Sequence, residues 1–268
     1  MLDLAIIGSG PAALTAALYV ARAGFKVEVF EKAKIGGALT EIAKLENYPG
    51  FVGTGDEFID TLKKQCKDAG VTIIYGECTS VNPLVIDEEA VSARAVLIAT
   101  GSEPKTLDFD AKKPVSYCAL CDGSLYQGKN VAVIGGGNSA ISGAIYLASI
   151  ANQVTVLTRS KLKATDCIIK KATEFSNIKI CEQTKVNADA LAVYDGIFVF
   201  IGKRPATTFM PAKTLDKDGY IKTNNYMSKL KGVFAAGDVR ADSIKQVVTA
   251  SADGAAAAIA IMDYLNHD

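Results

Sequence analysis

The chain has 268 residues, 49% of them hydrophobic and 22% charged, and its 29 lysines and arginines balance 29 aspartates and glutamates. This balance gives no reason to expect a partner that is nucleic acid or a membrane surface. The one histidine, His267, is the penultimate residue. Histidine-based nucleophile systems and histidine metal sites are therefore not expected, and we predict no metal site. Catalysis would have to use cysteine, carboxylate or lysine side chains, or a bound cofactor.

Neither a targeting segment nor a membrane segment is expected. Residues 1–8 lack a positively charged region and become glycine-rich at once, unlike a signal peptide. The apolar stretch at 255–262 is too short to span a bilayer. We therefore expect a cytoplasmic protein. Six cysteines are too few for a disulfide scaffold in a chain of this length, and Cys118 and Cys121 are the closely spaced pair.

One pattern occurs twice along the chain. Residues 4–13 (LAIIGSGPAA) and 131–140 (VAVIGGGNSA) each join a β-branched run to a helical pattern through a glycine cluster. Further β-branched runs follow at 27–31 and 154–157. Such βαβ units imply parallel sheets with helices on their faces. The sequence thus predicts an α/β fold with two Rossmann-like nucleotide-binding domains.

The glycines suit a phosphate site. They allow the chain to turn sharply and to approach a pyrophosphate closely, so that the phosphate meets the N–H groups at the start of the helix. Glu31, at the end of the second strand, is placed to accept a hydrogen bond from a ribose hydroxyl. A glycine-rich turn without a ligand remains the alternative for both copies.

Other segments complete the domain plan. Apolar runs predict strands at 71–75, 95–99, 196–202 and 232–238, and an alanine-rich pattern predicts a last helix over about 243–266. Proline and charged residues cluster at 103–114 and 203–205, as linkers do. We therefore expect one domain made of residues 1–110 and 204–268, with residues 111–203 inserted in it as a second domain.

The CxxC pair Cys118–Cys121 is open to three interpretations. Half a zinc site would need further ligands, yet the other cysteines are isolated; the second possibility is a pair of inert buried thiols. The third is a redox couple, because the two sulfurs can meet within one turn and a nearby base or helix end lowers a thiol pKa. Asp122 could exchange a proton with a thiolate, and could also cap a helix.

Together these motifs resemble the low-molecular-weight thioredoxin reductases along nearly the whole chain. The matching segments are GSGPAA at 8–13, GGAL at 36–39, ENYPG at 46–50, ATG at 99–101, CALCDG at 118–123, GGGNSA at 135–140, GDV at 237–239, and KQ at 245–246 with Gly254.

The resemblance implies an FAD domain and a smaller NAD(P)H-binding-like domain. The residues that would hold the ADP half of FAD are Gly8, Gly10, Pro11, Ala12 and Glu31. Asn47 would lie by the flavin, Asp238 would bind the ribityl–phosphate region, and Gln246 would begin the helix that faces the isoalloxazine. Further cofactor contacts would be Gly37, Thr100, Gly101 and Gly237 for FAD, and Gly135, Gly137, Arg159 and Lys163 for a dinucleotide.

The resemblance also implies the chemistry. Cys121 would take electrons from the flavin, Cys118 would attack the disulfide of thioredoxin, and Asp122 would act as acid and base. A homodimer is implied as well.

The chain departs from the family around the electron donor. It is shorter than usual around 78–95 and 181–195, and the arginine-rich HRRxxxR segment that binds a 2′-phosphate reads TRSKLK at 158–163. Arg159 remains, but Ser160 and Lys163 stand where the family has arginines, so fewer guanidinium groups can bind the phosphate with two hydrogen bonds each. Relatives that take electrons from ferredoxin make reduced ferredoxin our favoured donor, with Lys32, Lys34 or Lys44 as possible contacts. NADPH is the alternative donor.

The leading hypothesis is thus a flavoprotein that reduces a thioredoxin disulfide through FAD and Cys118/Cys121. A non-catalytic flavoprotein redox sensor is the second hypothesis. An NAD(P)H–ferredoxin oxidoreductase is the third, although it would have no use for the CxxC pair.

Overall fold

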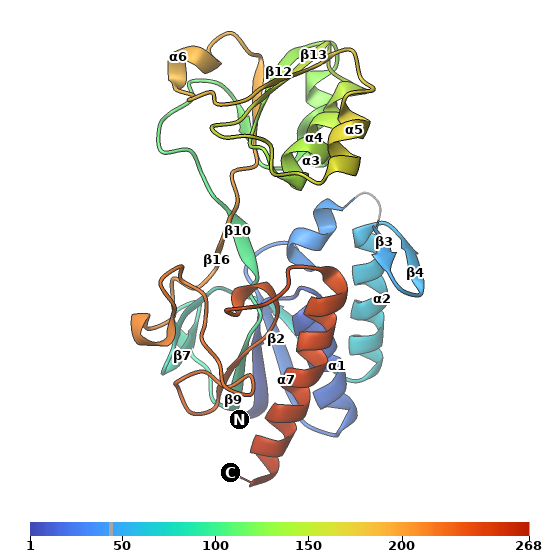
Figure 1. The fold of residues 1–268 in the computed structure, drawn as a ribbon. Helices are drawn as coiled ribbons and strands as arrows, with labels where there is room; N and C mark the ends of the chain where they lie inside the picture. The colour runs from blue at the N-terminus through green and yellow to red at the C-terminus, as the bar shows by residue number, and fades with distance from the viewer. Residues whose placement is uncertain (43–44, 268) are drawn as a thin grey trace. The chain divides into compact units, whose positions relative to one another are not determined.

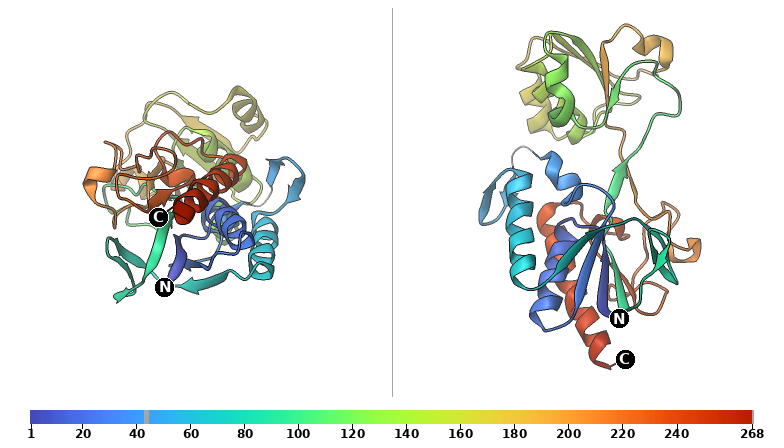
Figure 2. Two further views of the ribbon diagram at one scale, coloured as in Figure 1. Left: turned by 90° about the horizontal axis from the view of Figure 1, so that it is seen from below. Right: turned by 180° about the vertical axis from the view of Figure 1, so that it is seen from behind.

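The computed structural model describes residues 1–42 and 45–267, and the chain forms two compact units. Unit 1 comprises Met1–Glu103 and Arg204–Asp268, and unit 2 comprises Pro104–Lys203 (Figures 1 and 2). Unit 2 therefore interrupts the chain of unit 1. The two connecting strands, β10 (Ser102–Pro104) and β16 (Lys203–Pro205), pair with each other.

Unit 1 is built on a parallel sheet of five strands in the order β17-β9-β1-β2-β5. The strands are β1 (Leu2–Ile7), β2 (Val27–Glu31), β5 (Thr72–Tyr75), β9 (Ala93–Ile98) and β17 (Val233–Ala235). Alternate side chains of β1 enter different cores: Leu4 and Ile6 enter one, and Ala5 and Ile7 enter the other. Since all strands are parallel, their carboxyl ends lie at one edge of the sheet.

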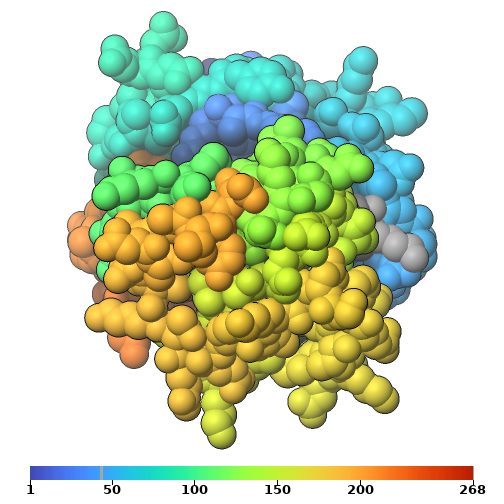
Figure 3. Space-filling view, turned by 90° about the horizontal axis from the view of Figure 1, so that it is seen from above, coloured from blue at the N-terminus to red at the C-terminus, as the bar shows by residue number. Residues whose placement is uncertain are grey.

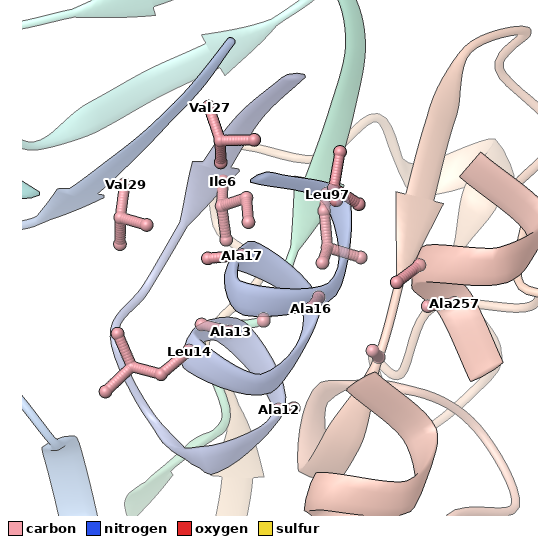
Figure 4. Close-up of a cluster of buried hydrophobic side chains, with 14 of the residues drawn as sticks. Ile6, Ala12, Ala13, Leu14, Ala16, Ala17, Val27, Val29, Leu97 and Ala257 are labelled. Atoms are coloured by element: carbon pink, nitrogen blue, oxygen red, sulfur yellow. The ribbon is translucent and has the colours of Figure 1, made fainter. Parts of the chain in front are cut away.

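Three helices cover the first face of this sheet: α1 (Pro11–Arg22), α2 (Gly55–Asp68) and α7 (Val247–His267). Pro11 at the first helical position favours the start of α1, since proline lacks the N–H that a helix leaves unpaired there. In Figure 4 the alanines of α1 lie between Ile6 and Leu97 of the sheet and Ala257 of α7. A Cβ on Gly254 of α7 would stand 2.2 Å from the Ala12 carbonyl oxygen. Small side chains thus allow α7 to pack close, as the sequence indicates.

Smaller elements complete unit 1. A hairpin is formed by β3 (Leu45–Tyr48) and β4 (Phe51–Gly53), and a three-stranded antiparallel sheet by β6 (Cys78–Val81), β7 (Leu84–Ile86) and β8 (Glu89–Ala90). The three-stranded sheet covers the second face of the main sheet, where Leu84 and Ile86 join the core of Phe30 and Ile98.

Unit 2 repeats the architecture with a parallel sheet in the order β11-β15-β12-β13-β14. Its strands are β11 (Val115–Ser116), β12 (Asn130–Ile134), β13 (Gln153–Leu157), β14 (Ile178–Cys181) and β15 (Gly196–Val199). Its helices are α3 (Ala119–Asp122), α4 (Asn138–Ala148), α5 (Asp166–Ala172) and α6 (Ala188–Leu191). Ile141 and Leu147 of α4 pack on Val133 and Phe198 of the sheet. The α/β class with two Rossmann-like sheets is thereby confirmed.

Several element ends differ from the sequence prediction. Strand β17 ends at Ala235 because the chain then enters a 3-10 turn at Gly237–Val239. Strand β15 ends at Val199, before Gly202 turns with a φ of 104°. Helix α7 begins at Val247 rather than near residue 243, and the Thr249 hydroxyl donates to carbonyl oxygens before the helix.

Helix α7 is also the one described helix that is long and apolar enough for a membrane span. Core helices pass the same test, and six α7 side-chain positions are buried within unit 1: Ser251, Gly254, Ala257, Ala258, Ile261 and Leu265. This feature is therefore weak evidence for a membrane location.

Because α7 packs so close to α1, we expect replacing Gly254 by alanine to lower the stability of the protein instead of raising it. Gly→Ala inside a helix normally stabilises by about 1 kcal/mol. We expect Gly254→Ala to destabilise by about 1–3 kcal/mol, because its Cβ would overlap the Ala12 carbonyl. Urea unfolding checks this, with Ala252→Gly at an exposed position of α7 as the control, expected to cost about 1 kcal/mol. An increase in the free energy of unfolding for Gly254→Ala would contradict the prediction.

Candidate functional site

The first glycine turn joins β1 to α1 at the carboxyl edge of the sheet. Gly8 has a φ of 98°, and a Cβ there would stand 2.5 Å from the carbonyl oxygen of Ala99. Only glycine fits such an approach. The turn thus brings the start of α1 beside the end of β9.

The start of α1 is suited to an anion. Gly10 occupies the N-cap without a side-chain hydrogen bond, so the first N–H groups of the helix receive no side-chain cap. Apart from the chain neighbours of Gly10, no atom of the described residues lies within 4 Å of where a Cβ on Gly10 would stand. The first turn of this 12-residue helix, with Pro11 and Ala12, therefore faces open space that a pyrophosphate could fill.

Glu31 is held firmly at the end of β2. Its Oε2 accepts a hydrogen bond of 2.6 Å from the Ser9 hydroxyl, and its Oε1 accepts one of 3.0 Å from the Ala33 N–H. The Ser9 oxygen in turn accepts the Gly36 N–H at 3.0 Å. Each carboxylate oxygen keeps a lone pair, so Glu31 can still accept from a ribose hydroxyl. Ser9 and Gly36 gave no clear signal of this role in the sequence.

Two further pairs of predicted residues follow strands at the same edge. Gly237 comes after β17 with a φ of 76°, and a Cβ on it would stand 2.9 Å from the Ala12 Cβ. The turn that contains Asp238 thus lies against the start of α1. Thr100 and Gly101 follow β9, and the Thr100 hydroxyl donates to the Ala206 carbonyl at 2.7 Å. This bond ties the two chain segments of unit 1 together.

The remaining predicted FAD contacts also lie in unit 1. The Asn47 side-chain amide donates to Gln246 Oε1 at 3.1 Å, which joins the β3–β4 hairpin to the start of α7. Gln246 directly precedes α7, whose first residue is Val247. Gly37 begins the 3-10 turn Gly37–Glu41 directly after Gly36.

The second glycine turn, in unit 2, has the same geometry. Gly135 has a φ of 139°, and its Cβ would stand 2.2 Å from the Phe200 carbonyl oxygen. Gly137 is the N-cap of α4, without a side-chain hydrogen bond. Apart from its chain neighbours, no atom in the described part of the chain lies within 4 Å of where its Cβ would stand. This turn therefore also faces open space at a helix start.

The basic residues predicted for a dinucleotide phosphate lie close to this turn along the chain. The N–H groups of Lys163 and Ala164 both donate to the Gly136 carbonyl, at 2.7 and 3.0 Å, so the segment returns to the glycine turn. Arg159 and Lys163 are exposed. Figure 3 shows atoms of this yellow-green part of the chain at the surface of unit 2. Their charges are thus available to a ligand.

Cys118 and Cys121 are joined by a disulfide around the single turn of α3. Cys118 is the N-cap of this turn, and its sulfur accepts the Cys121 N–H at 3.1 Å. Cys121 is exposed and Cys118 partly buried. The buried Ser116, which the sequence did not single out, holds the approach to the turn: its oxygen accepts the Cys118 N–H at 3.1 Å.

Asp122, for which the sequence left a helix cap as an alternative role, occupies the N-cap position of the 3-10 turn Gly123–Tyr126. It is also the last residue of α3, and its side chain makes no cap hydrogen bond. Cys118 has the extended backbone that a cap requires, so its sulfur takes that role. Burial, and then the charge of Asp122, raise the pKa of the Tyr126 phenol. Tyr126 packs where Gly196 leaves room, since a Cβ there would stand 2.0 Å from its ring.

Two other thiols are chemically quiet. Burial raises the pKa of both Cys66 and Cys78 to about 11, so they stay protonated near neutral pH. These two buried thiols therefore do not compete with the Cys118–Cys121 pair; the other free cysteines are Cys167, which is exposed, and Cys181, which is partly buried.

Comparisons with known proteins agree with this geometry. Residues 2–254 match the family described as pyridine nucleotide-disulphide oxidoreductase. Thioredoxin reductases from Bacillus subtilis and Peptoclostridium acidaminophilum are 35% and 37% identical over 300 and 304 residues, and both alignments cover 98% of this chain. They cover 94% and 96% of the respective relatives. Since the chain has 268 residues, the relatives carry segments that it lacks.

A solved structure gives the same result. The crystal structure of Lactococcus lactis thioredoxin reductase in its FR conformation is 29% identical, with a TM-score of 0.91 and 100% of each chain covered. The chain belongs to the pyridine nucleotide-disulphide oxidoreductases and, among them, to the thioredoxin reductase family of flavoprotein oxidoreductases.

Proposed function

We propose that this protein reduces the disulfide of thioredoxin with electrons that pass from FAD in unit 1 to the Cys118–Cys121 disulfide. The observation that carries the proposal is this disulfide, which closes around one turn. The same chain has an uncapped first turn of α1 beside Glu31, which we call the nucleotide cradle. The names of the similar proteins support thioredoxin as the substrate.

The residues of unit 1 fit FAD. The first turn of α1 offers its N–H groups to the pyrophosphate, and Glu31 offers an oxygen to the ribose. Asn47, Asp238 and Gln246 would contact the flavin half of the cofactor. When bound, FAD supplies the electron pair that reduces the disulfide.

The two sulfurs have different chemical roles. We assign Cys121, the exposed residue of the pair, to accept the electrons, and the Cys121 N–H stabilises a thiolate on Cys118. Cys118 is therefore the better leaving group and afterwards the nucleophile. Its thiolate attacks the thioredoxin disulfide and forms a mixed disulfide, with one thioredoxin thiolate leaving. Cys121 then attacks Cys118, which releases reduced thioredoxin, and Asp122 accepts and returns the proton of the Cys121 thiol.

Serine substitutions test this assignment. Cys118→Ser and Cys121→Ser should each abolish thioredoxin reduction and keep the yellow flavin, because one sulfur cannot complete the exchange. Cys167→Ser, at an exposed free cysteine, is the matched control and should keep full activity. Turnover with thioredoxin and absorbance of the flavin are the readouts. Activity that survives either substitution, or a folded wild-type protein without flavin, contradicts the proposal.

Glu31→Gln tests the cofactor cradle separately. The neutral amide keeps the shape but loses the charge that strengthens the hydrogen bonds from Ser9 and a ribose. We expect FAD affinity of the apoprotein to fall by about tenfold. Glu28→Gln, on the same strand, should leave the affinity unchanged. Equal effects of the two variants would contradict the role of Glu31.

Reduced ferredoxin is the electron donor that we propose. Its support is the thinned phosphate site, where Ser160 and Lys163 stand in place of arginines that would clamp a 2′-phosphate. Of the basic residues expected to help, Lys32 and Lys34 each bind a carboxylate at 3.0 Å, and Lys44 lies outside the described residues. Such exposed pairs are weak and can exchange partners.

NADPH is the second candidate donor. The geometry that favours it is the uncapped start of α4 at Gly137, which matches the start of α1. Arg159 and Lys163 would then meet the phosphate of the adenosine.

Anaerobic stopped-flow measurements distinguish the donors. We expect reduced ferredoxin to bleach the flavin rapidly. NADPH should be needed at a concentration about a hundredfold higher than in a protein that keeps both arginines at the 2′-phosphate, because the missing hydrogen bonds are worth on the order of 3 kcal/mol. NADH should do no better than NADPH. The double variant Ser160→Arg, Lys163→Arg should lower the NADPH concentration needed to bleach the flavin, whereas Lys161→Arg should leave that concentration unchanged. Rapid bleaching of the wild type by micromolar NADPH would refute the ferredoxin proposal.

A non-catalytic redox sensor remains the alternative, motivated by the same thinned site. No turnover of thioredoxin with any donor, although the disulfide is reduced by the flavin, would favour it. We further propose that the protein is cytoplasmic and forms a homodimer. Sedimentation of the FAD-loaded protein tests whether it is a dimer.

A further inference from the structure

Helix α7 carries a carboxylate whose hydrogen bonds leave the helix. Asp253 Oδ2 accepts the main-chain N–H of Gly237 at 3.2 Å and Nε of Arg240 at 3.1 Å. Its Oδ1 accepts Nη2 of Arg240 at 3.1 Å. Gly237 begins the 3-10 turn Gly237–Val239, and Arg240 directly follows it. One side chain therefore binds both ends of this turn.

An aromatic ring closes the group. The Arg240 guanidinium lies 4.9 Å from the ring centroid of Tyr226, and the Tyr226 hydroxyl lies 3.5 Å from Asp253 Oδ1. Burial and the neighbouring Asp253 raise the pKa of Tyr226, so its hydroxyl stays protonated as a donor. Tyr226 has a φ of 66°, which aromatic residues rarely adopt, and these contacts hold it there.

The clamped turn lies beside the nucleotide cradle. A Cβ on Gly237 would stand 2.9 Å from the Ala12 Cβ, and one on Gly254, next to Asp253, would stand 2.2 Å from the Ala12 carbonyl oxygen. The carboxylate is mostly buried, with 16% of the side chain exposed, so its bonds to arginine are little screened by solvent. Asp238 lies inside the clamped turn, between the two residues that Asp253 binds.

We propose that Asp253, with Arg240 and Tyr226, is a positioning group for the flavin nucleotide. It holds the turn Gly237–Val239 against the first turn of α1, so that Asp238 and the start of α1 meet the cofactor together. Asp253 itself touches no reacting atom. The inference rests on the proposed binding of FAD in unit 1.

Cofactor affinity of the apoprotein is the direct test. Asp253→Asn should raise the Kd for FAD by about tenfold or more, because the neutral amide cannot hold the N–H of Gly237 and both arginine nitrogens. Asp263→Asn is the matched control, since Asp263 lies on α7, is exposed and pairs with His267. Its Kd should equal that of the wild type. Thermal unfolding of each apoprotein shows that binding is measured on folded protein.

A double-mutant cycle separates positioning from general damage. Adding Arg240→Gln to Asp253→Asn restores a neutral hydrogen-bonded pair, so the Kd of the double variant should rise less than the product of the two single effects. Arg240→Lys, which keeps the charge but loses the two parallel bonds, serves if Asp253→Asn fails to fold. A wild-type Kd for folded Asp253→Asn or Arg240→Lys, or independent effects in the cycle, would overturn the inference. A wild-type protein that binds no FAD would instead refute the proposed function.

Discussion

The structure of unit 1 depends on two close backbone approaches to the start of α1. On one side, a Cβ on Gly8 would stand 2.5 Å from the carbonyl oxygen of Ala99. On the other side, a Cβ on Gly254 would stand 2.2 Å from the carbonyl oxygen of Ala12. These contacts fix the first turn of α1 between the ends of β1 and β9 and the helix α7. The uncapped N–H groups of that turn then face the same edge as Glu31 and Gly237. We expect this arrangement to suit a phosphate without any charged side chain in the turn itself.

The geometry of the Cys118–Cys121 disulfide also depends on a main-chain group rather than on a charged side chain. A single turn brings Cys118 and Cys121 together. The main-chain N–H of Cys121, in the first turn of α3, donates to the sulfur of the N-cap residue Cys118. The local backbone therefore makes the two sulfurs unequal before any partner arrives. Buried Cys66 and Cys78, with pKa values raised to about 11, contribute no competing thiolate.

Local patterns in the sequence were sufficient to predict both glycine turns and the meeting of the Cys118 and Cys121 sulfurs within one turn. The two βαβ units place Gly8, Gly135 and their helices correctly, because a turn from strand to helix is determined by neighbouring residues. Asp122 lies at the N-cap position of a 3-10 turn without a side-chain hydrogen bond, whereas the Cys118 sulfur caps α3, because capping depends on backbone angles that the residue types do not reveal. The start of α7 was placed too early for a similar reason.

Contacts between distant residues could not be predicted in this way. Asp253 binds Gly237 and Arg240 across two elements, and no spacing along the chain marks it. Ser9 holds Glu31 across 22 residues, which only the parallel pairing of β1 and β2 explains. Such side chains became visible only when the strand order was known.

We propose that the flavin and the Cys118–Cys121 disulfide form one chain of electron carriers. Anaerobic titration of the FAD-loaded protein with dithionite, with thiols counted after denaturation at each step, measures where the electrons go. We expect each chain to take up one electron pair at the flavin and another at the disulfide, and the new thiols to map to Cys118 and Cys121. Uptake that ends with the flavin, and leaves that disulfide intact, would contradict it.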